Sequence, residues 1–314
     1  GVGVGEAGGS PPAHSMISDI FAPTQRATAL SIYSIGIYLG ILAGFMLGGW
    51  IGEFFGWRTA FLVVGLPGVL LAIVVRFTVQ EPPRGWSQNV VDVAPSPPFI
   101  DVIKLLWSRP AFRHISVAAG LQAFVGFGLG NWIPSYFLRT FDIGLGELGT
   151  WLALTVGFGG GIGTFLGGYL SDRFGVKDKR WYLWIPAISI LAVMPVSVIL
   201  LTANNPYLGL LLTVPLNLLI GIYLGPVLAI THGMVGLRMR ALSSAILFFV
   251  LNLIGMGLGP TVVGFLSDLL IPVFGQDSLR YSMMLLGSIV SIWCCLHYLL
   301  AARTVRHDLA NAPT

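Results

Sequence analysis

Two long apolar runs of this sequence meet at Gly167-Gly168-Tyr169-Leu170-Ser171-Asp172-Arg173-Phe174-Gly175-Val176-Lys177-Asp178-Lys179-Arg180, a stretch rich in charge and glycine. Its glycines allow close packing and chain reversal, and Asp172 ends the preceding run with a carboxylate. Its four basic residues are typical of loops that stay on the cytoplasmic side of a membrane. The stretch therefore predicts a tight cytoplasmic turn between two membrane spans.

The overall composition indicates a polytopic membrane protein. Charged residues make up 10% of the chain and the mean hydropathy is +0.84, whereas soluble domains carry about 25% charged residues. The net charge of +4 does not indicate nucleic-acid binding, because the basic residues lie in short breaks between apolar runs and not on one soluble surface. The only cysteines, Cys294 and Cys295, are adjacent in an apolar run, which excludes an ordinary disulfide between them and a metal cluster.

Apolar runs long enough to cross the hydrocarbon core, about 20 residues each, recur along the chain with short polar breaks. The eight clear runs are residues 29–52, 59–79, 113–137, 148–170, 181–202, 207–235, 242–270 and 281–301. Residues 1–21 are rich in Gly, Ala, Ser and Pro. We interpret them as a ninth span, because small residues let transmembrane helices pack closely.

The basic residues orient these spans. Nine spans with the carboxyl end in the cytoplasm place 14 of the 17 Lys and Arg residues inside, as the positive-inside rule requires. The three exceptions are Arg58, Arg139 and Arg280. We therefore expect an integral protein of the bacterial inner (plasma) membrane with its carboxyl terminus in the cytoplasm.

Residues 80–112 divide the chain. Prolines in Glu81-Pro82-Pro83-Arg84-Gly85 and Pro95-Ser96-Pro97-Pro98 end the preceding helix and keep the linker extended. Apolar residues from Phe99 to Trp107 then recur at helical spacing, which predicts a short amphipathic helix at the membrane interface, with an ordinary loop as the alternative. The predicted domains are residues 1–79 with three spans, the cytoplasmic linker 80–112, a six-helix bundle at 113–303 and a cytoplasmic tail at 304–314.

An internal repeat indicates two related halves. Pro12 aligns with Pro226, and Arg26-Ala27 aligns with Arg240-Ala241 at the same offset. With one residue of slip, Gly40, Gly44, Gly49 and Glu53 align with Gly255, Gly259, Gly264 and Asp268. Each half thus has a span ending in Arg-Ala followed by a glycine-rich span, and many secondary transporters are built from repeated halves of this kind.

The charged turn closely resembles the loop signature of the major facilitator superfamily, with Gly168, Asp172, Arg173, Gly175 and Lys177 in the order and spacing of that motif. Gly56-Trp57-Arg58 is similar to a signature at the outer end of the superfamily's fifth span. The resemblance implies an all-α membrane protein of two helical bundles, with about nine transmembrane helices of an expected twelve, matching the fourth to the twelfth. We therefore expect three further spans before Gly1.

A narrower resemblance is to the spinster-like branch of the superfamily, carried by Gly3-Val4-Gly5-Glu6-Ala7, Ser18-Asp19-Ile20-Phe21, Gln25-Arg26 and Gly257-Leu258-Gly259-Pro260. It implies that Glu6 is the membrane-embedded glutamate of the fourth span. It also implies transport of lysophospholipids or sphingoid phosphates with proton coupling. Gly8-Gly9 departs from the branch's pattern, and the substrate does not follow from the resemblance.

Polar residues within spans are costly unless they are paired or face a cavity, so they mark candidate sites. Glu6, Ser10 and His14 share one helical stripe, where Glu6 is a candidate for proton coupling or for a fixed ion pair. The cavity-lining candidates, each of which has a helix–helix hydrogen bond as its alternative role, are Gln122, Asn131, Tyr136, Asn217, Tyr223 and Asn252. We expect His232 near the cytoplasmic end, with an interfacial position as one alternative. His114, His297 and His307 are expected at the surface or the interface.

The predicted gating loop contains Gly168, Asp172, Arg173, Gly175 and Lys177, together with Arg26 and Arg240. The superfamily resemblance implies that Asp172 faces the positive amino end of the span beginning near Thr28, with Arg240 nearby. A carboxylate in that position is stabilised by the helix dipole.

These features predict a secondary active transporter of a lipid-like or amphipathic organic anion. Proton-coupled transport of small organic anions is the alternative, and a membrane-embedded enzyme or receptor is a weaker one because no catalytic motif accompanies the two similar halves. No cofactor or metal is expected. The expected partners are the lipid bilayer, the substrate and protons, with no nucleic acid, and the chain is expected to act as a monomer.

Overall fold

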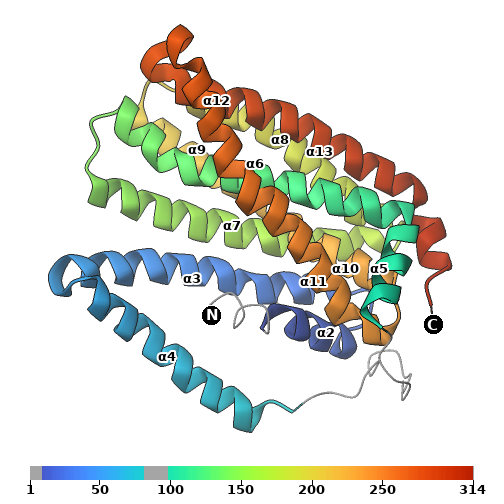
Figure 1. Cartoon of the computed structure of the whole chain (residues 1–314). Coiled ribbons are helices and arrows are strands. Elements are labelled where there is room, and N and C mark those ends of the chain that lie inside the picture. Colours follow the sequence, from blue (N-terminus) through green and yellow to red (C-terminus); the bar gives the residue numbers. More distant parts are fainter. Residues whose placement is uncertain (1–8, 81–97, 314) are drawn as a thin grey trace.

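The structure is a computed structural model of the chain, and it describes residues 9–80 and 98–313. Its long helices run roughly side by side (Figure 1). The described elements are α2 (Ser10–Ile20), α3 (Arg26–Phe55), α4 (Trp57–Thr78), α5 (Phe99–Ser108), α6 (Pro110–Thr140), α7 (Leu145–Gly175), α8 (Trp181–Thr202), α9 (Pro206–Gly221), α10 (Leu224–Gly233), η2 (Leu237–Met239), α11 (Arg240–Leu251), η3 (Asn252–Leu258), α12 (Gly259–Phe274), η4 (Gly275–Asp277) and α13 (Ser278–Ala310). These elements are all helical, which confirms the predicted all-α fold.

Six stretches within the described residues are long and apolar enough to cross a membrane. They are Arg26–Gly44, Arg58–Thr78, Glu147–Gly175, Trp181–Thr202, Pro206–Gly233 and Leu237–Ala310. The last stretch contains both the α11–α12 segment and α13, which runs back in the opposite direction (Figure 1). Helix α6 is 31 residues long but is not in this set.

Two of the predicted spans are interrupted. The predicted span 207–235 is divided into α9 and α10 at Ile222 and Tyr223, and the predicted span 242–270 contains the π-helical stretch η3 between α11 and α12. Pro226 follows the first interruption and Pro260 the second, and proline lacks the N–H that an unbroken helix would use. Interruptions of this kind are frequent at functional sites.

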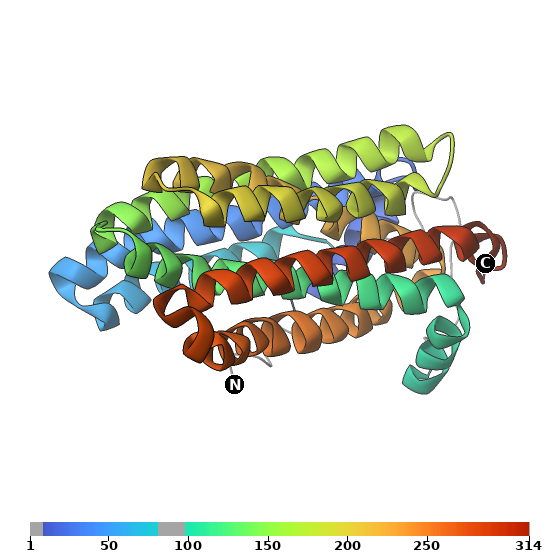
Figure 2. The same cartoon turned by 90° about the horizontal axis from the view of Figure 1, so that it is seen from above.

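The second half of the chain forms one packed bundle. Helix α13 packs along α6 and α8, α7 packs along α9, and α12 fills the space beside α6 and α13 (Figure 2). The aromatic ring of Tyr298 and the thiol of Cys294 are fully buried between α13 and α6, where the Cys294 thiol donates to the carbonyl oxygen of Ala118 at 3.1 Å. This bundle is the scaffold against which the first half of the chain packs.

Helix α7 joins the two halves through glycines on two of its faces. A Cβ atom on Gly163 would overlap the carbonyl oxygen of Leu218 in α9, so only a glycine permits this approach. On another face, a Cβ atom on Gly160 would overlap the ring of Tyr38 in α3. The α7 backbone therefore lies directly against α9 and α3.

The two predicted glycine-rich spans pack differently. Gly255 and Gly259 of the second lie against Ala123 and Phe124 of α6, as close packing predicts. Gly36, Gly40 and Gly44 of the first have no atom within 4 Å of an added Cβ among the described residues. Helix α3 instead contacts α7 through larger side chains on another face.

The close contact between α7 and α9 predicts how a substitution at Gly163 changes stability. Replacing Gly163 by Ala should lower the free energy of unfolding by about 1–3 kcal/mol, because the added methyl group overlaps backbone that cannot move aside. Gly161, two residues away on the same helix, has its nearest neighbouring atom 4.0 Å from an added Cβ. Gly161→Ala is therefore the matched control and should be neutral or stabilising by up to about 1 kcal/mol. Thermal unfolding in detergent measures both variants, and equal midpoints would show that the α7–α9 contact is not tight.

The first half of the chain meets this bundle mainly through α2 and α3. Helix α3 packs against α7 and α10, and α2 packs against α11. Helix α4 packs chiefly against α3 and diverges from the other helices (Figure 1). It exposes large apolar side chains such as Phe61 and Phe77, as expected for a helix that faces lipid.

The chain reverses direction between successive long helices, so α3 and α6 begin, and α7, α10 and α13 end, at one end of the molecule. We call this end, at the right in Figure 1, the Asp172 end. Helix α5 lies there and buries Val102 and Leu106. A helix thus forms where the linker was predicted to contain one. Helix α6 begins beside α5, and its first turn is capped by Asp308 of α13, which accepts from the N–H of Ala111 at 2.8 Å.

Candidate functional site

Asp172 caps the first turn of α3 from the end of α7. Its carboxylate accepts from the backbone N–H of Thr28 at 2.7 Å and of Ala27 at 3.3 Å. The hydroxyl of Tyr182, in the first turn of α8, donates to the same carboxylate at 2.7 Å. The free N–H groups at a helix start favour a negative charge. The described geometry therefore has Asp172 at the amino end of α3, in the position that the resemblance implied.

A buried ion pair joins α2 to α11 beside this cap. The guanidinium of Arg240 lies 3.0 Å from a carboxylate oxygen of Asp19, and their side chains are 3% and 1% exposed. Arg240 was predicted to lie near Asp172, but its ion pair in the structure is with Asp19. The hydroxyl of Tyr182 and two backbone N–H groups of α3 donate to Asp172 instead.

Three further residues complete this group, which we call the gate cluster: Ser18, Asp19, Arg26, His232 and Arg240. The carbonyl oxygen of Ser18 accepts from Arg26 at 3.0 Å and from Arg240 at 3.1 Å. Arg26 and Arg240 are the two arginines that the internal repeat aligns. The repeat-related arginines of the two halves thus meet at one carbonyl oxygen, and this oxygen links α2 to both α3 and α11.

His232 is fully buried in the gate cluster and is not interfacial, which was one alternative for it. Its Nδ1 atom lies 2.6 Å from the hydroxyl of Ser18, and its Nε2 atom lies 2.6 Å from the hydroxyl of Ser244. A neutral imidazole has one donor and one acceptor nitrogen, which suits a hydroxyl on each side. His232 therefore connects α2, α10 and α11.

The turn between α7 and α8 contains the rest of the predicted gating loop. A Cβ atom on Gly168 would meet the hydroxyl of Ser31 and the carbonyl oxygen of Ala27 in α3, and one on Gly175 would meet the ring of Tyr182. Arg173 is exposed and donates to the hydroxyl of Tyr169 at 3.0 Å. Lys177 is exposed. The two glycines thus allow α3 and α8 to approach the turn, while the two cations face outward.

Asp178 ties this turn to the last turns of α13. Its carboxylate lies 2.9 Å from Arg180 and 2.6 Å from Arg306. Desolvation of the carboxylate acts to raise its pKa, but hydrogen bonds from Arg180 and Arg306 outweigh this and lower the pKa of Asp178 to about 2. The group therefore stays ionised across the physiological range, and the ion pairs fix the turn against α13.

A cavity of about 330 Å³ lies midway along the bundle, between α3, α6, α7 and α9. Its lining residues Tyr38 and Gln122 each lie 12 residues from the start of their helices, or about 18 Å from the Asp172 end. The walls are mostly apolar, and the polar groups among the described lining residues are Tyr38, Gln122, Thr213, Asn217 and Tyr223. None of the described lining residues is charged.

Three of the six cavity candidates line this cavity. The side chain of Gln122 accepts from Tyr298 at 2.9 Å. Asn217 donates to the carbonyl oxygen of Thr213 at 2.8 Å. Tyr223 occupies the break between α9 and α10. All three therefore have a surface in the cavity, and Gln122 and Asn217 also form hydrogen bonds that hold their side chains in place.

The other three candidates lie elsewhere. Asn131 is exposed and donates to the carbonyl oxygen of Phe127 one turn earlier. Tyr136 is buried, donates to the carbonyl oxygen of Leu201 at 2.9 Å and packs against neighbouring aromatic rings. Asn252 is exposed at the start of η3. The hydroxyl of Tyr136 thus forms a hydrogen bond between α6 and α8. A helix–helix hydrogen bond of this kind was the alternative to a role in the cavity.

The stripe on the first helix is described only in part. Glu6 lies outside the described residues. Ser10 begins α2 and is half-buried. His14 is buried between Tyr33 of α3 and Phe248 of α11, with ring centroids 5.2 and 5.4 Å away. His14 thus packs among aromatic rings where α2 meets both halves, and it is not among the described residues that line the 330 Å³ cavity.

Sequence reasoning missed several members of the site. Ser18 and Asp19 were noted only as part of the stretch that resembles the spinster-like branch, and no role was assigned to either. Tyr38 and Tyr182 gave no signal, because an aromatic residue in an apolar run is normally read as packing. Within the described ranges, no group of three or more His, Cys, Asp or Glu side chains lies close enough to hold a metal ion.

The gate cluster, the capped α3 helix and the uncharged mid-bundle cavity together describe two helical halves that meet around a central space. Residues 2–260 match the model of the Major Facilitator Superfamily. The chain belongs to the Major Facilitator Superfamily. It is therefore an integral membrane protein, and six stretches within its described residues are long and apolar enough to span the membrane.

Similar proteins include an efflux pump and a spinster homolog. An MFS-type efflux pump of Mycolicibacterium smegmatis is 32% identical over 98% of this chain and 71% of that protein. Protein spinster homolog 1 of Bos taurus is 35% identical over 46% of this chain, and the match spans 28% of that protein's length. The spinster-like resemblance is thus confirmed.

A solved superfamily structure extends the similarity to nearly the whole chain. The crystal structure of a bacterial homolog to the human lysosomal transporter Spinster, in an inward-facing and unoccupied conformation, matches with a TM-score of 0.72 and 26% identity. The match covers 97% of this chain and 76% of that one. The superfamily fold predicted from the charged turn is therefore confirmed.

Proposed function

We propose that this protein is a secondary active transporter that works by alternating access, and that its substrate is a lipid-like or amphipathic organic molecule bound in the 330 Å³ cavity. Alternating access needs two halves that close one end of a central site at a time. Here the gate cluster and the Asp172 cap join α2 and α3 to α7, α10 and α11 at one end. We place the Asp172 end in the cytoplasm because it carries the cluster of basic residues.

The lining of the cavity is the observation that supports an amphipathic substrate. Apolar walls with a few uncharged hydrogen-bonding groups suit a molecule with an apolar body and a small polar part. A compact organic anion would lose its hydration in such a space without gaining a cation and without burying much apolar surface in return, which is unfavourable. The amphipathic substrate is therefore preferred to the small organic anion.

Gly130 offers a way to test the cavity without disturbing packing. It lines the cavity, and no atom lies within 4 Å of a Cβ atom added to it. A Trp at this position should fill the space and reduce binding of a dansyl-labelled long-chain fatty acid at least tenfold, or about 1.4 kcal/mol. Gly149 has equally open surroundings but does not line the cavity, so Gly149→Trp is the matched control.

The measurement is fluorescence titration of the purified protein, with adipate as a compact anionic competitor. Saturable fatty-acid binding that Gly130→Trp removes and Gly149→Trp keeps would support the proposal. Uptake of the fatty acid by proteoliposomes under an imposed pH gradient would then test coupled transport. Displacement by adipate at equal concentration would favour the small-anion alternative, and unchanged binding in Gly130→Trp would contradict the cavity as the site.

A further inference from the structure

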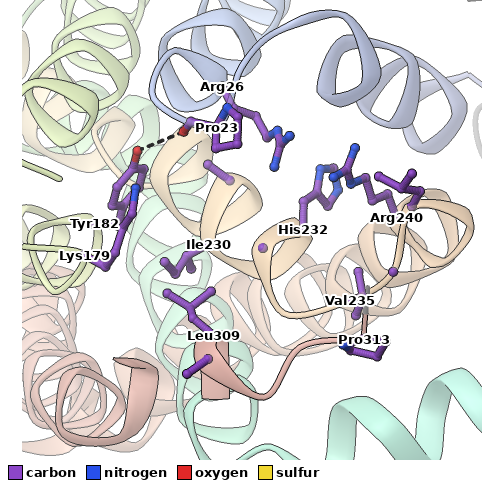
Figure 3. Close-up of a pocket in the computed structure, with 15 residues that line it drawn as sticks. Pro23, Arg26, Lys179, Tyr182, Ile230, His232, Val235, Arg240, Leu309 and Pro313 are labelled. Carbon is purple, nitrogen blue, oxygen red and sulfur yellow. Dashed lines mark hydrogen bonds between the residues drawn. The ribbon is translucent and has the colours of Figure 1, made fainter. Parts of the chain in front are cut away.

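The five histidines of the chain differ in their access to water. His232 lies at the wall of a cavity of about 620 Å³ at the Asp172 end (Figure 3), but both of its ring nitrogens lie 2.6 Å from hydroxyl oxygens. His14 is buried among aromatic rings. The other three, His114, His297 and His307, reach the surface, and the first two lie against each other.

His114 of α6 and His297 of α13 form a close pair. Their Nδ1 atoms lie 3.0 Å apart, and their ring centroids are 5.1 Å apart with the planes inclined at 51°. The two helices are joined on either side by other contacts, such as the cap that Asp308 provides at the start of α6 and the hydrogen bond from Cys294 to Ala118. The backbone therefore fixes the two histidines as neighbours. The sequence did not indicate this pair, because its members are 183 residues apart.

The pair is open to water near the Asp172 end. His114 lies four residues after Pro110, the first residue of α6, or about 6 Å along the helix axis. Trp293, one turn from His297, is 52% exposed, and the centroids of the two rings are 6.0 Å apart. Exposed Trp residues are typical of the interface between membrane and water. Both imidazoles are only partly buried, so a small solute from the water phase can reach them.

The separation of the two Nδ1 atoms suits a shared metal ion. An ion bound by two imidazoles at about 2.0–2.1 Å holds their nitrogens about 3.3–3.4 Å apart in tetrahedral geometry and about 2.8–3.0 Å apart at a right angle. The observed 3.0 Å therefore matches a square-planar ion and needs only a small increase for a tetrahedral one. Each ring must also turn, so that its lone pair points at the ion and not along the line between the nitrogens.

The exchange of the hydrogen bond for a metal ion is balanced in protons. The hydrogen bond needs one Nδ1 atom that carries a proton and one that does not. Metal binding needs both Nδ1 atoms unprotonated, so the protonated ring moves its proton to Nε2 by exchange with water. Both imidazoles stay neutral, and two metal–nitrogen bonds replace one hydrogen bond.

We propose that His114 and His297 form a binding site for a divalent transition-metal ion such as Zn²⁺, Ni²⁺ or Cu²⁺. Imidazole nitrogen is a preferred ligand of these ions, whereas Mg²⁺ and Ca²⁺ prefer oxygen. Among the described residues, no third His, Cys, Asp or Glu joins the pair, so water fills the remaining positions. Arg113 beside His114 is exposed, and water weakens its repulsion of the ion. The ion is therefore bound less tightly than in a site with four protein ligands, and it exchanges with the medium.

A bound ion fastens the start of α6 to α13. Both helices belong to the second half of the chain, and a ligand stabilises the arrangement that binds it. Occupancy therefore stabilises that bundle without bridging the two halves. The site is separate from the 330 Å³ cavity, whose described lining includes neither histidine.

The test is thermal unfolding in detergent, at neutral pH, of the protein purified without a histidine tag. Zn²⁺ and Ni²⁺ are titrated, with Mg²⁺ and Ca²⁺ as comparison ions at the same concentrations. We expect a saturable rise of the midpoint with Zn²⁺ and Ni²⁺ and none with Mg²⁺ or Ca²⁺. Fatty-acid binding in the same samples reports on the transport cavity separately, so failure of the metal site is distinguishable from failure of the proposed function.

Variants connect the response to the pair. His114→Gln and His297→Gln should each weaken the apparent affinity for Ni²⁺ about tenfold or more, through the loss of one of two ligands. The double variant should be no weaker than either single variant, because one imidazole alone does not bridge the helices. His307→Gln is the matched control and should keep the response. The His307 side chain is 79% exposed near the end of α13, 3.6 Å from the carboxylate of Asp308.

Bound Cu²⁺ counts the ligands directly. Cys294 and Cys295 are replaced by Ala so that no thiol reduces the ion, and one equivalent of Cu²⁺ is added. Pulsed electron paramagnetic resonance should then detect two coordinated imidazoles, and only one after His114→Gln or His297→Gln.

Three results would overturn the proposal. The first is the absence of a saturable response to Zn²⁺, Ni²⁺ and Cu²⁺, and the second is an equal response to Mg²⁺, which would indicate a nonspecific effect of divalent charge. The third is a response that His307→Gln removes while His114→Gln and His297→Gln keep it, which would place the ion at the end of α13.

Discussion

Replacing Asp172 by Asn is expected to separate α3 from α7 at the Asp172 end. The substitution removes the charge that faces the amino end of α3 and leaves one acceptor oxygen for the N–H groups of Ala27 and Thr28 and the hydroxyl of Tyr182. The helix dipole and the charge-assisted hydrogen bonds together stabilise the contact by about 1–3 kcal/mol. A loss of that size changes the ratio of the closed to the open arrangement of this end by roughly ten- to a hundredfold.

Spin labels on Gln25 and Arg303 measure this separation. Both residues are exposed, one before α3 and the other near the end of α13, and Cys294 and Cys295 are replaced by Ala so that only these sites are labelled. Asp172→Asn should add a population with a longer distance. Tyr182→Phe removes one donor but keeps the carboxylate, so it should have a smaller effect. A distance distribution that Asp172→Asn leaves unchanged would mean that this carboxylate does not hold the end closed.

The membrane spans could be predicted from the sequence because each needs a long apolar run. The predicted span 181–202 coincides with α8 (Trp181–Thr202), and the predicted span 113–137 lies within α6 (Pro110–Thr140). The breaks within the predicted spans 207–235 and 242–270 were not foreseen. Hydropathy reflects the free energy of transferring a segment from water into lipid. Whether a helix is interrupted depends instead on which of its backbone N–H and C=O groups find hydrogen-bond partners in neighbouring helices.

The charged turn was informative because the residues of its motif lie within a short stretch of chain. Asp172 was recognised from its spacing to Gly168, Arg173 and Gly175, although the helix that it caps, α3, begins more than 140 residues earlier. Asp19 and Arg240 are separated by 221 residues, and no local pattern links them. The repeat did align Arg26 with Arg240, but it did not indicate that both would donate to Ser18.

Cavity residues were the least predictable from sequence. Gln122 and Tyr136 are both polar groups within one apolar helix, yet Gln122 lines the cavity while Tyr136 bonds to the backbone of α8. They lie 14 residues apart, about 21 Å along the helix axis, so their depth and the helices around them differ. The helical repeat alone cannot supply that information.

Replacing Asp19 by Asn is expected to have the largest effect on stability. The pair with Arg240 is almost fully buried, and the substitution removes the negative charge that Asp19 places 3.0 Å from the guanidinium. Removing one partner of a buried pair typically costs about 3–5 kcal/mol. Unfolding by denaturant in mixed micelles should detect a loss of this size, and the label pair on Gln25 and Arg303 should report opening of the Asp172 end.

Asp277→Asn is the matched control for this variant. Asp277 pairs with Arg280 at 3.4 Å, but its side chain is 54% exposed, and exposed pairs contribute only about 0–1 kcal/mol. The same chemical change should therefore have little effect on stability. Equal losses for Asp19→Asn and Asp277→Asn would contradict a structural role for the buried pair.

The double variant Asp19→Leu with Arg240→Met separates the cost of an unpaired charge from the net contribution of the ion pair. Buried ion pairs replaced by apolar residues of similar size are often as stable as the original, because desolvation offsets the attraction between the charges. We expect the double variant to recover much of the stability that either single variant loses, with a coupling energy of about 0.5–3 kcal/mol. It should nevertheless open the Asp172 end less readily than the native protein, because apolar side chains resist exposure to water when the halves separate. If the double variant instead unfolds as readily as Asp19→Asn, the hydrogen bonds from Arg240 to Ser18, and not its charge, hold α2 against α11.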